Sequence, residues 1–338
     1  MQKQLVTLVA AAAFTLTATA AFADTLADVK KDGFVKCGVT EGVPGFSLPD
    51  ANNEWSGLDV DYCRALASAI FNDPKAVRFT PTTSENRWQT LSSGEVQVLS
   101  RTSTWTMTRD TTLGIKFVGT TYYDGQGFIV RKASGIKSAK ELGGATICIE
   151  SGTTTELNAA DYFAANKMEY NPVTFTSQDE TLKAYEDGRC DVYTTDASAL
   201  AGNRLDFAVP DDHIILPEII SKEPLAVVVR QGDDGWFNIT RWTYYALLEA
   251  EEQGVTKANV DEMLGSDSPS IKRLLGLEGD FGTPMGLTKD WAYQIIKGVG
   301  NYGEIFDRNV GKDSPIGIAR GLNALWKDGG LQYSPPIR

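Results

Sequence analysis

The chain has 338 residues, with 32 Lys and Arg against 44 Asp and Glu and a formal net charge of -12. This acidic balance argues against nucleic acid or an anionic bilayer as a partner, because those surfaces repel a negatively charged protein. The single histidine makes a His-rich metal site impossible, and we expect neither a metal nor a cofactor. The length is sufficient for two lobes, each with a core of its own.

The first 23 residues are predicted to be a cleaved Sec signal peptide. Lys3 gives a small positive start, residues 5–21 are apolar and rich in Ala and Thr, and Ala21-Phe22-Ala23 provides the small residues that precede cleavage. A membrane-spanning helix is the alternative, but the run is short and no charged stop follows it. The mature chain should therefore begin at Asp24 as an exported protein.

The segment after Asp24 alternates between strand and helix patterns. Its predicted elements are strands at residues 34–39, 77–80 and 96–99 and helices at residues 58–70 and 86–93. In the first helix, Asp59 and Asp61 are expected to face water or the helix start. This alternation is typical of a mostly parallel sheet with helices on its faces.

The same alternation starts again in the middle of the chain. Its predicted elements are strands at residues 115–118, 128–130, 145–149, 173–175 and 190–193, a turn into a helix at residues 151–165, and a helix at residues 180–187. A second alternating unit in one chain predicts a second α/β lobe.

Two segments are candidates for crossing between the lobes. Residues 122–127 are aromatic and punctuated by Gly, and residues 225–229 form an apolar strand pattern. Residues 236–264 look helical, and two crossings imply that the tail returns to the first lobe. We therefore predict a first lobe from residues 24–123 and 227–338 and a second lobe from residues 124–226.

Four cysteines in an exported protein suggest two disulfides, for which three connectivities are possible. Cys37 lies in an early predicted strand and Cys63 in the helix that follows, whereas Cys148 and Cys190 lie in later strands. We expect the pairs Cys37–Cys63 and Cys148–Cys190, one in each lobe. The cysteine spacings do not resemble those of zinc sites.

Residues 102–109 read Thr-Ser-Thr-Trp-Thr-Met-Thr-Arg and follow a short apolar strand. A planar guanidinium beside several hydroxyl groups is suited to holding a carboxylate out of water. The alternative is a solvated Thr-rich loop with Arg109 on the surface, because such runs are common in loops.

A free amino acid is a ligand that would use these groups. Arg109, Thr102 and Thr104 could hold its carboxylate from the first lobe. Thr153 and Thr154 stand at a predicted helix start in the second lobe, where unpaired N–H groups and the helix dipole favour an anion. Helix capping is the alternative role for both residues.

Asp196 is the predicted acceptor for the ammonium group of such a ligand. Gly94 is followed eight residues later by Thr102, and Gly188 is followed eight residues later by Asp196. Each half of the chain thus has a polar strand end, and ligands of open α/β sheets bind outside the carboxyl ends of strands. Chance similarity and a simple N-cap role for Asp196 are the alternatives.

The mature chain resembles the polar amino acid-binding proteins that feed ABC importers, solute-binding family 3, and is most similar to general L-amino acid-binding proteins. The stretches that carry the resemblance are residues 57–61, 99–109, 151–156, 191–196 and 300–306. The resemblance implies a type II periplasmic-binding-protein fold, in which two α/β lobes joined by two crossing strands close on one amino acid. It also implies a periplasmic monomer that delivers its ligand to an inner-membrane ABC permease.

The resemblance gives roles to individual residues. Arg109 with Thr104 and Thr154 would hold the α-carboxylate, Asp196 would hold the α-ammonium, and Thr102 lies beside both.

Ser84 and Arg87 match the stretch by which glutamate- and aspartate-binding relatives contact the distal carboxylate of the ligand, although Arg87 could equally be a surface helix residue. Thr40 stands near where those relatives carry another Arg. A site for polar side chains in general, among them glutamate, glutamine, aspartate and asparagine, therefore fits better than strict dicarboxylate selectivity.

An enzyme on the same scaffold, similar to a dehydratase, is the competing hypothesis. Its general acid or base would have to be Glu41, Glu150 or Asp196. His213 looks like part of a surface turn, and neither a Gly-x-Ser-x-Gly elbow nor a phosphate-binding Gly-Lys loop is present. We therefore expect a binding protein without catalytic activity.

Overall fold

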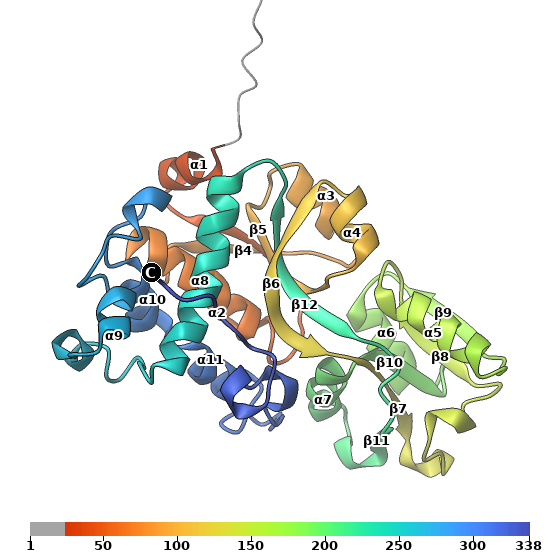
Figure 1. The fold of residues 1–338 in the computed structure, drawn as a ribbon. Coiled ribbons are helices and arrows are strands. Elements are labelled where there is room, and N and C mark those ends of the chain that lie inside the picture. Colours follow the sequence, from red (N-terminus) through yellow and green to blue (C-terminus); the bar gives the residue numbers. More distant parts are fainter. Residues whose placement is uncertain (1–23) are drawn as a thin grey trace, which may run out of the picture.

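The computed structural model describes residues 24–338, and the predicted signal peptide lies outside the described residues. The described chain forms two α/β lobes, each built on a five-stranded sheet, as the alternating pattern predicted (Figure 1). The sheet orders are β4-β1-β5-β12-β6 in the first lobe and β11-β7-β10-β8-β9 in the second. A two-stranded ribbon of β2 (Leu48–Pro49) and β3 (Trp55–Ser56) accompanies the first lobe.

The first sheet consists of β1 (Val35–Val39), β4 (Val77–Pro81), β5 (Val98–Thr104), β6 (Ile115–Asp124) and β12 (Glu223–Arg230). Strand β1 pairs in parallel with β4 and β5, whereas β12 runs antiparallel to both β5 and β6. The sheet core includes Val35, Val98 and Val227, all fully buried, as expected for strands covered on both faces.

The second sheet consists of β7 (Gln126–Arg131), β8 (Thr146–Glu150), β9 (Asn171–Phe175), β10 (Val192–Asp196) and β11 (His213–Ile215). Strand β8 lies parallel to β9 and β10, and β7 lies antiparallel to β10 and β11. The parallel pairs need helical crossovers, which α5 and α6 supply.

The helices of the first lobe and the tail are α1 (Thr25–Asp32), α2 (Leu58–Phe71), α3 (Arg87–Ser92), α4 (Met107–Thr112), α8 (Asp234–Glu252), α9 (Pro269–Leu274), α10 (Trp291–Val299) and α11 (Tyr302–Asn309). Those of the second lobe are α5 (Thr154–Ala165), α6 (Gln178–Glu186) and α7 (Ala197–Asp206). Helices α10 and α11 pack against α2 and α8 (Figure 1), so the tail does return to the first lobe.

The chain crosses between the lobes twice. Strand β6 of the first sheet leads through Gly125 directly into β7 of the second, and the segment after β11 returns to the first sheet as β12. Strands β6 and β12 pair along their lengths and run together toward the second lobe (Figure 1). The first crossing lies within residues 122–127, as predicted. The second lies between β11 and β12, ahead of the predicted residues 225–229, which pair within the first sheet. The exact lobe boundaries stay a prediction.

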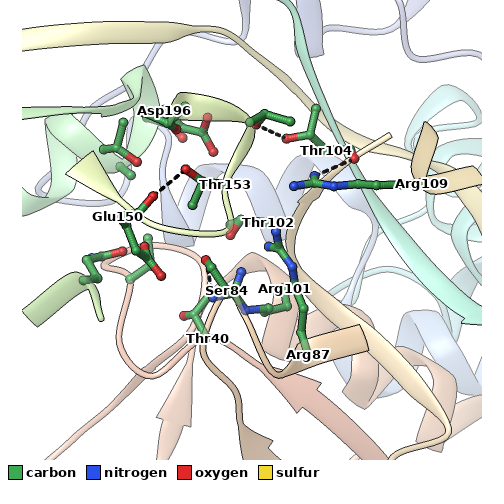
Figure 2. A pocket seen from close by; sticks show the side chains of 17 residues that line it. Thr40, Ser84, Arg87, Arg101, Thr102, Thr104, Arg109, Glu150, Thr153 and Asp196 are labelled. Atoms are coloured by element: carbon green, nitrogen blue, oxygen red, sulfur yellow. Dashed lines mark hydrogen bonds between the residues drawn. The ribbon is translucent and has the colours of Figure 1, made fainter. Parts of the chain in front are cut away.

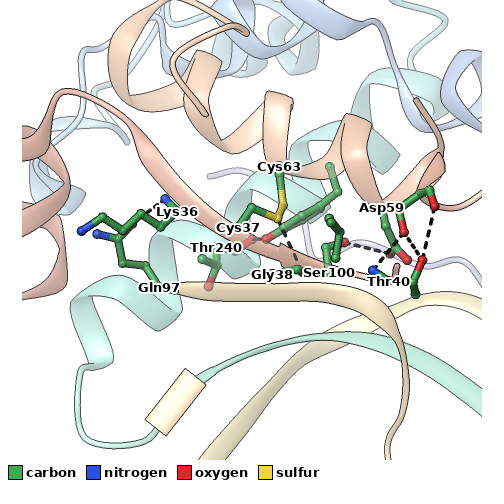
Figure 3. The surroundings of a disulfide bond; sticks show 12 residues. Lys36, Cys37, Gly38, Thr40, Asp59, Cys63, Gln97, Ser100 and Thr240 are labelled. Carbon is green, nitrogen blue, oxygen red and sulfur yellow. Dashed lines mark hydrogen bonds between the residues drawn. A yellow bond between two sulfur atoms is a disulfide. The ribbon is translucent and has the colours of Figure 1, made fainter. Parts of the chain in front are cut away.

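Both disulfides form as expected. Cys37 on β1 is bonded to Cys63 on α2 (Figure 3), and Cys148 on β8 is bonded to Cys190 just before β10. The Cα atoms are 6.3 and 5.6 Å apart, respectively. Each bridge therefore ties secondary-structure elements within one lobe and leaves the two lobes free to move against each other.

Several local predictions were wrong for reasons that involve tertiary contacts. Strand β5 extends to Thr104, so that Thr102 and Thr104 lie in a strand and not in a loop, and helix α4 follows it. Helix α8 ends at Glu252, well before residue 264. Pairing with β12 on one side of β5 prolongs the strand beyond its apolar run.

Asp59 and Asp61 are buried and do not face water, which corrects the expectation for the first turn of α2. Asp59 accepts hydrogen bonds from the Ser100 hydroxyl at 2.8 Å and the Thr102 amide at 3.0 Å, and burial raises its pKa to about 6. Asp61 forms an ion pair with Arg308 of α11 at 2.7 Å. The acidic side chains at this helix start thus hold tertiary contacts.

His213 is also more buried than a surface turn would allow. It begins β11, and its Nδ1 lies 2.8 Å from the hydroxyl of Tyr185.

None of the helices within residues 24–338 combines the length and the apolar character that a bilayer-spanning segment needs.

Candidate functional site

A polar pocket lies between the two lobes, with a cavity volume of about 40 Å³. Its lining contains all eight residues predicted from the sequence to contact a ligand: Ser84, Arg87, Thr102, Thr104, Arg109, Thr153, Thr154 and Asp196. Three arginines occupy one side of the pocket, and Asp196 and Glu150 lie on the opposite side (Figure 2).

Arg109 is placed by the helix that follows β5. The Thr106 hydroxyl caps α4 by accepting from the Arg109 amide at 3.2 Å, and the Arg109 guanidinium donates to the Thr104 carbonyl at 3.0 Å. Its carbon lies 5.3 Å from the ring centre of Trp88. Burial lowers the pKa of Arg109 to about 10, so the group stays charged at neutral pH. Arg109 is therefore part of the pocket and not a surface loop residue.

The start of α5 contributes backbone donors from the second lobe. Thr153 is the N-cap, and its hydroxyl accepts from the Glu156 amide at 3.4 Å and donates to the Glu150 carbonyl at 2.7 Å. The capping alternative for Thr153 is thus realised within the pocket. The amides of Thr154 and Thr155 belong to the first turn, where N–H groups lack partners within the helix and the dipole favours an anion.

Asp196 ends β10 at the position before α7. Its side chain makes no capping hydrogen bond, so the N-cap alternative does not account for its carboxylate. Burial raises the pKa of Asp196 well above its usual value, and the neighbouring Asp124 and Glu223 raise it further. A cation placed beside Asp196 would therefore stabilise its ionised form.

Arg87 is buried, with only 3 % of its surface exposed, which rules out the surface-helix alternative. Its Nη2 donates to the Gly152 carbonyl across the two lobes at 3.4 Å, and its guanidinium carbon lies 4.7 Å from the Trp88 ring centre. Its Nε has no hydrogen-bond partner within residues 24–338. Burial and the nearby Arg101 lower the pKa of Arg87 well below its usual value. The Arg87 guanidinium is therefore suited to donating a hydrogen bond to an anionic group in the pocket.

Arg101 was not predicted as a site residue. It lies in the middle of β5, is buried, and donates from Nη2 to the Ser84 hydroxyl at 3.0 Å and from Nε to the Thr82 carbonyl at 3.2 Å. The only signal in the sequence was an Arg two residues after the apolar run of the strand. The pocket thus contains three guanidinium groups where two were expected.

Two buried carboxylates near Asp196 were also missed. Asp124 ends β6 and accepts a hydrogen bond from the Ser198 hydroxyl, and burial raises its pKa to about 6. Glu223 begins β12 and is only 2 % exposed. They are paired residues of the two crossing strands, so this cluster of carboxylates lies where the lobes join.

Of the groups considered for catalysis, Glu150 and Asp196 line the pocket, and Glu41 is exposed. His213 contacts Tyr185 and Phe207 in the second lobe. In the part of the chain that the structure describes, no group of three or more His, Cys, Asp or Glu side chains is arranged to hold a metal ion.

Comparison with known proteins agrees with this geometry. Residues 35–266 match the family described as bacterial extracellular solute-binding proteins, family 3. The chain belongs to this family.

Two relatives match this chain over nearly its whole length. It is 60 % identical to the general L-amino acid-binding periplasmic protein AapJ of Rhizobium johnstonii, over 98 % of this chain and 97 % of AapJ. It is 54 % identical to the glutamate/glutamine/aspartate/asparagine-binding protein BztA of Rhodobacter capsulatus, over 96 % of each chain.

A solved structure extends the comparison to three dimensions. The ABC transporter periplasmic binding protein from Brucella ovis, with glutathione bound, superposes with a TM-score of 0.92 at 62 % sequence identity, covering 94 % of this chain and 100 % of that one. The predicted type II periplasmic-binding-protein fold of the family 3 protein is thus confirmed.

Proposed function

We propose that this chain is the periplasmic amino acid-binding component of an ABC importer and that its two lobes close on a free L-amino acid with a polar side chain. The observation that carries the proposal is the presence of Arg109 and Asp196 in one pocket between the lobes. The two opposite charges match the carboxylate and the ammonium of a zwitterion.

The α-carboxylate is assigned to Arg109 and the first turn of α5. The guanidinium keeps donors that the Thr104 carbonyl does not use, and the Thr154 amide adds a donor from the other lobe. The α-ammonium is assigned to Asp196, whose charge is otherwise disfavoured by burial and by the neighbouring carboxylates. Thr102 and Thr153 line the pocket between these groups.

The ligand side chain is assigned to the region of Ser84, Arg87 and Arg101. The unpaired Nε of Arg87 and the Arg101–Ser84 hydrogen bond favour an oxygen-rich side chain, either a carboxylate or an amide. Thr40 also lines the pocket here. This composition supports glutamate, glutamine, aspartate and asparagine as ligands, in agreement with the name of the BztA relative.

The remaining parts of the proposal concern the partner, the location and the assembly of the protein. An inner-membrane permease as partner, a periplasmic location and the monomeric state are proposed, and residues 1–23 are proposed as the export signal. The name of AapJ supports a broad ligand range. The enzyme alternative receives no support from these relatives, which are named as binding proteins.

A thermal-shift panel of the twenty L-amino acids and glutathione tests the proposal, because a ligand that binds only the folded protein raises its melting temperature. We expect polar amino acids to give the largest shifts, and calorimetry to show that Arg109→Ala abolishes their binding. Glutathione is included because the Brucella ovis relative was solved with it. Unchanged affinity of Arg109→Ala for glutamate and glutamine would contradict the assignment.

A further inference from the structure

Glu223 contacts both lobes at once from the start of the second crossing strand. Its Oε2 accepts from the Thr104 hydroxyl of β5 at 2.6 Å and from the Thr154 hydroxyl of α5 at 2.8 Å. Its Oε1 accepts from the Asn158 amide of α5 and from the Ser221 hydroxyl, each at 2.6 Å. One buried carboxylate therefore joins the first sheet, the first helix of the second lobe and the crossing segment.

The carboxylate lies behind the pocket and not in it. Thr104 and Thr154 line the pocket, whereas Glu223 and Asn158 are not part of its lining. A ligand therefore meets the two hydroxyl groups and not the carboxylate that organises them.

The hydrogen-bond inventory determines what these hydroxyl groups can offer. An ionised carboxylate only accepts hydrogen bonds, and a Thr hydroxyl has a single proton. Because Thr104 and Thr154 both donate to Glu223, only their lone pairs remain for the pocket. The α-carboxylate must then obtain its donors from Arg109 and the backbone of α5, and the lone pairs favour the ammonium group.

We propose that Glu223 is a positioning residue that holds the two lobes together behind the ligand and turns the Thr104 and Thr154 hydroxyl groups into acceptors. The inference rests on the proposed function for its ligand and deepens it. In the open state the Thr104 and Thr154 hydroxyl groups separate, so one arm of this contact must break. Charge-assisted hydrogen bonds of a carboxylate are roughly twice as strong as neutral ones, which makes the contact a latch for the closed state.

A double-mutant cycle between Glu223→Gln and Asn158→Ala tests the latch. Of the two donors from the second lobe, Thr154 and Asn158, only Asn158 does not line the pocket, so its replacement leaves the ligand contacts in place. Titration calorimetry with L-glutamate and L-glutamine should show about tenfold weaker binding for Glu223→Gln and a smaller loss for Asn158→Ala. The double variant should bind no more than about twofold more weakly than Glu223→Gln, because both changes break one contact. Additive losses, or unchanged affinity of Glu223→Gln, would overturn the proposal.

Small-angle scattering of the ligand-free proteins gives a readout that does not depend on the ligand. Both single variants should be less compact than the wild type and should contract more on adding glutamate. Failure of the wild type to bind any amino acid would contradict the proposed function, while equal compactness of all ligand-free variants would contradict the latch. If Glu223→Gln does not fold, Asn158→Ala alone tests the latch. The latch would then be overturned if Asn158→Ala were as compact as the wild type and bound amino acids with the same affinity.

Glu85→Gln is the matched control. Glu85 also accepts from a hydroxyl of the other lobe, that of Ser151 at 2.6 Å, but this contact is exposed. Exposed polar contacts contribute little, so affinity and compactness should stay near those of the wild type. An effect as large as that of Glu223→Gln would mean that any contact between the lobes acts in the same way, and the special role of Glu223 would be wrong.

Discussion

Arg101 donates a hydrogen bond to Ser84 over 3.0 Å and thereby joins the middle of β5 to the loop that precedes α3. This contact puts a third guanidinium beside Arg87 at the end of the pocket assigned to the ligand side chain. Thr40, near which acidic-ligand relatives carry an Arg, lines the same region. Arg101, on β5, therefore supplies a positive charge in this region of the pocket, where Thr40 is uncharged.

Replacement of Arg101 by Met should weaken binding of acidic ligands more than that of amides. A charge-assisted hydrogen bond contributes about 1.5–3 kcal/mol, so affinity for glutamate should fall by about tenfold or more and that for glutamine by less. Calorimetric titration of both ligands measures the difference. Arg189→Met, at an exposed position of the second lobe, is the control, and equal losses for the two ligands would contradict the role of Arg101.

Amino acid affinity should fall as the pH decreases through about 6. Burial raises the pKa of Asp124 to about 6 in the ligand-free protein, and burial also raises the pKa of Asp196 well above its usual value. A bound ammonium favours the ionised carboxylates, so binding below these pKa values must release protons. Calorimetry at pH 5 to 8 in buffers of different ionisation enthalpy measures the release, and Asp124→Asn should release fewer protons.

The same groups predict how the stability of the ligand-free protein depends on pH. Because the folded-state pKa of Asp124 is raised, its neutral form stabilises the fold at low pH, and this contribution is lost as the pH rises through about 6. Asn resembles the neutral carboxyl. Asp124→Asn should therefore gain melting temperature relative to the wild type at pH 8 but not at about pH 3, which lies below the unfolded-state pKa of about 3.9. A pH-independent difference would contradict the raised pKa.

Removal of the Cys148–Cys190 bridge should lower the free energy of unfolding by about 4 kcal/mol. This value is the loop-closure entropy that a bridge of this span removes from the unfolded chain. The bridge spans a sequence separation of 42 residues and ties β8 to the segment before β10. Chemical denaturation of the double Ser variant, with and without glutamate, measures the loss. Affinity should change little, because neither cysteine lines the pocket.

The tail should stabilise the first crossing strand through Asn323. Its side chain accepts from the Tyr123 amide at 2.7 Å and donates to the Tyr123 carbonyl at 3.1 Å, and Asn323 is only 3 % exposed. Asn323→Ala leaves both backbone groups without this partner, so unfolding should become easier by about 1–3 kcal/mol. Urea denaturation checks this, with the exposed Asn52→Ala as a control that should change stability by less than about 0.5 kcal/mol.

The element order, both disulfides and the strand ends of the site were predictable from the sequence. Apolar side chains at period two or 3.6 determine which segments become strands or helices, and these patterns are local. The polar ends of these strands, predicted at Thr102 and Asp196, follow from the same rule, since parallel strands present their carboxyl ends at one edge of the sheet. The first of these strands continues to Thr104. Local patterns predicted Thr102, Thr104, Arg109, Thr153, Thr154 and Asp196 as site residues, and the resemblance to the family added Ser84 and Arg87. All eight line one pocket.

Only the tertiary structure decided which charged groups are buried. Asp59, Arg87 and Glu223 could each have faced water by the pattern of their own segment, and Arg101 could have been a simple strand end. Their burial depends on which residues of the other lobe, the tail or a neighbouring strand pack against them. The periodicity of a local segment contains no information about such distant contacts. The energy of a buried charge depends on its partners in space, and those partners come from segments far apart in the chain.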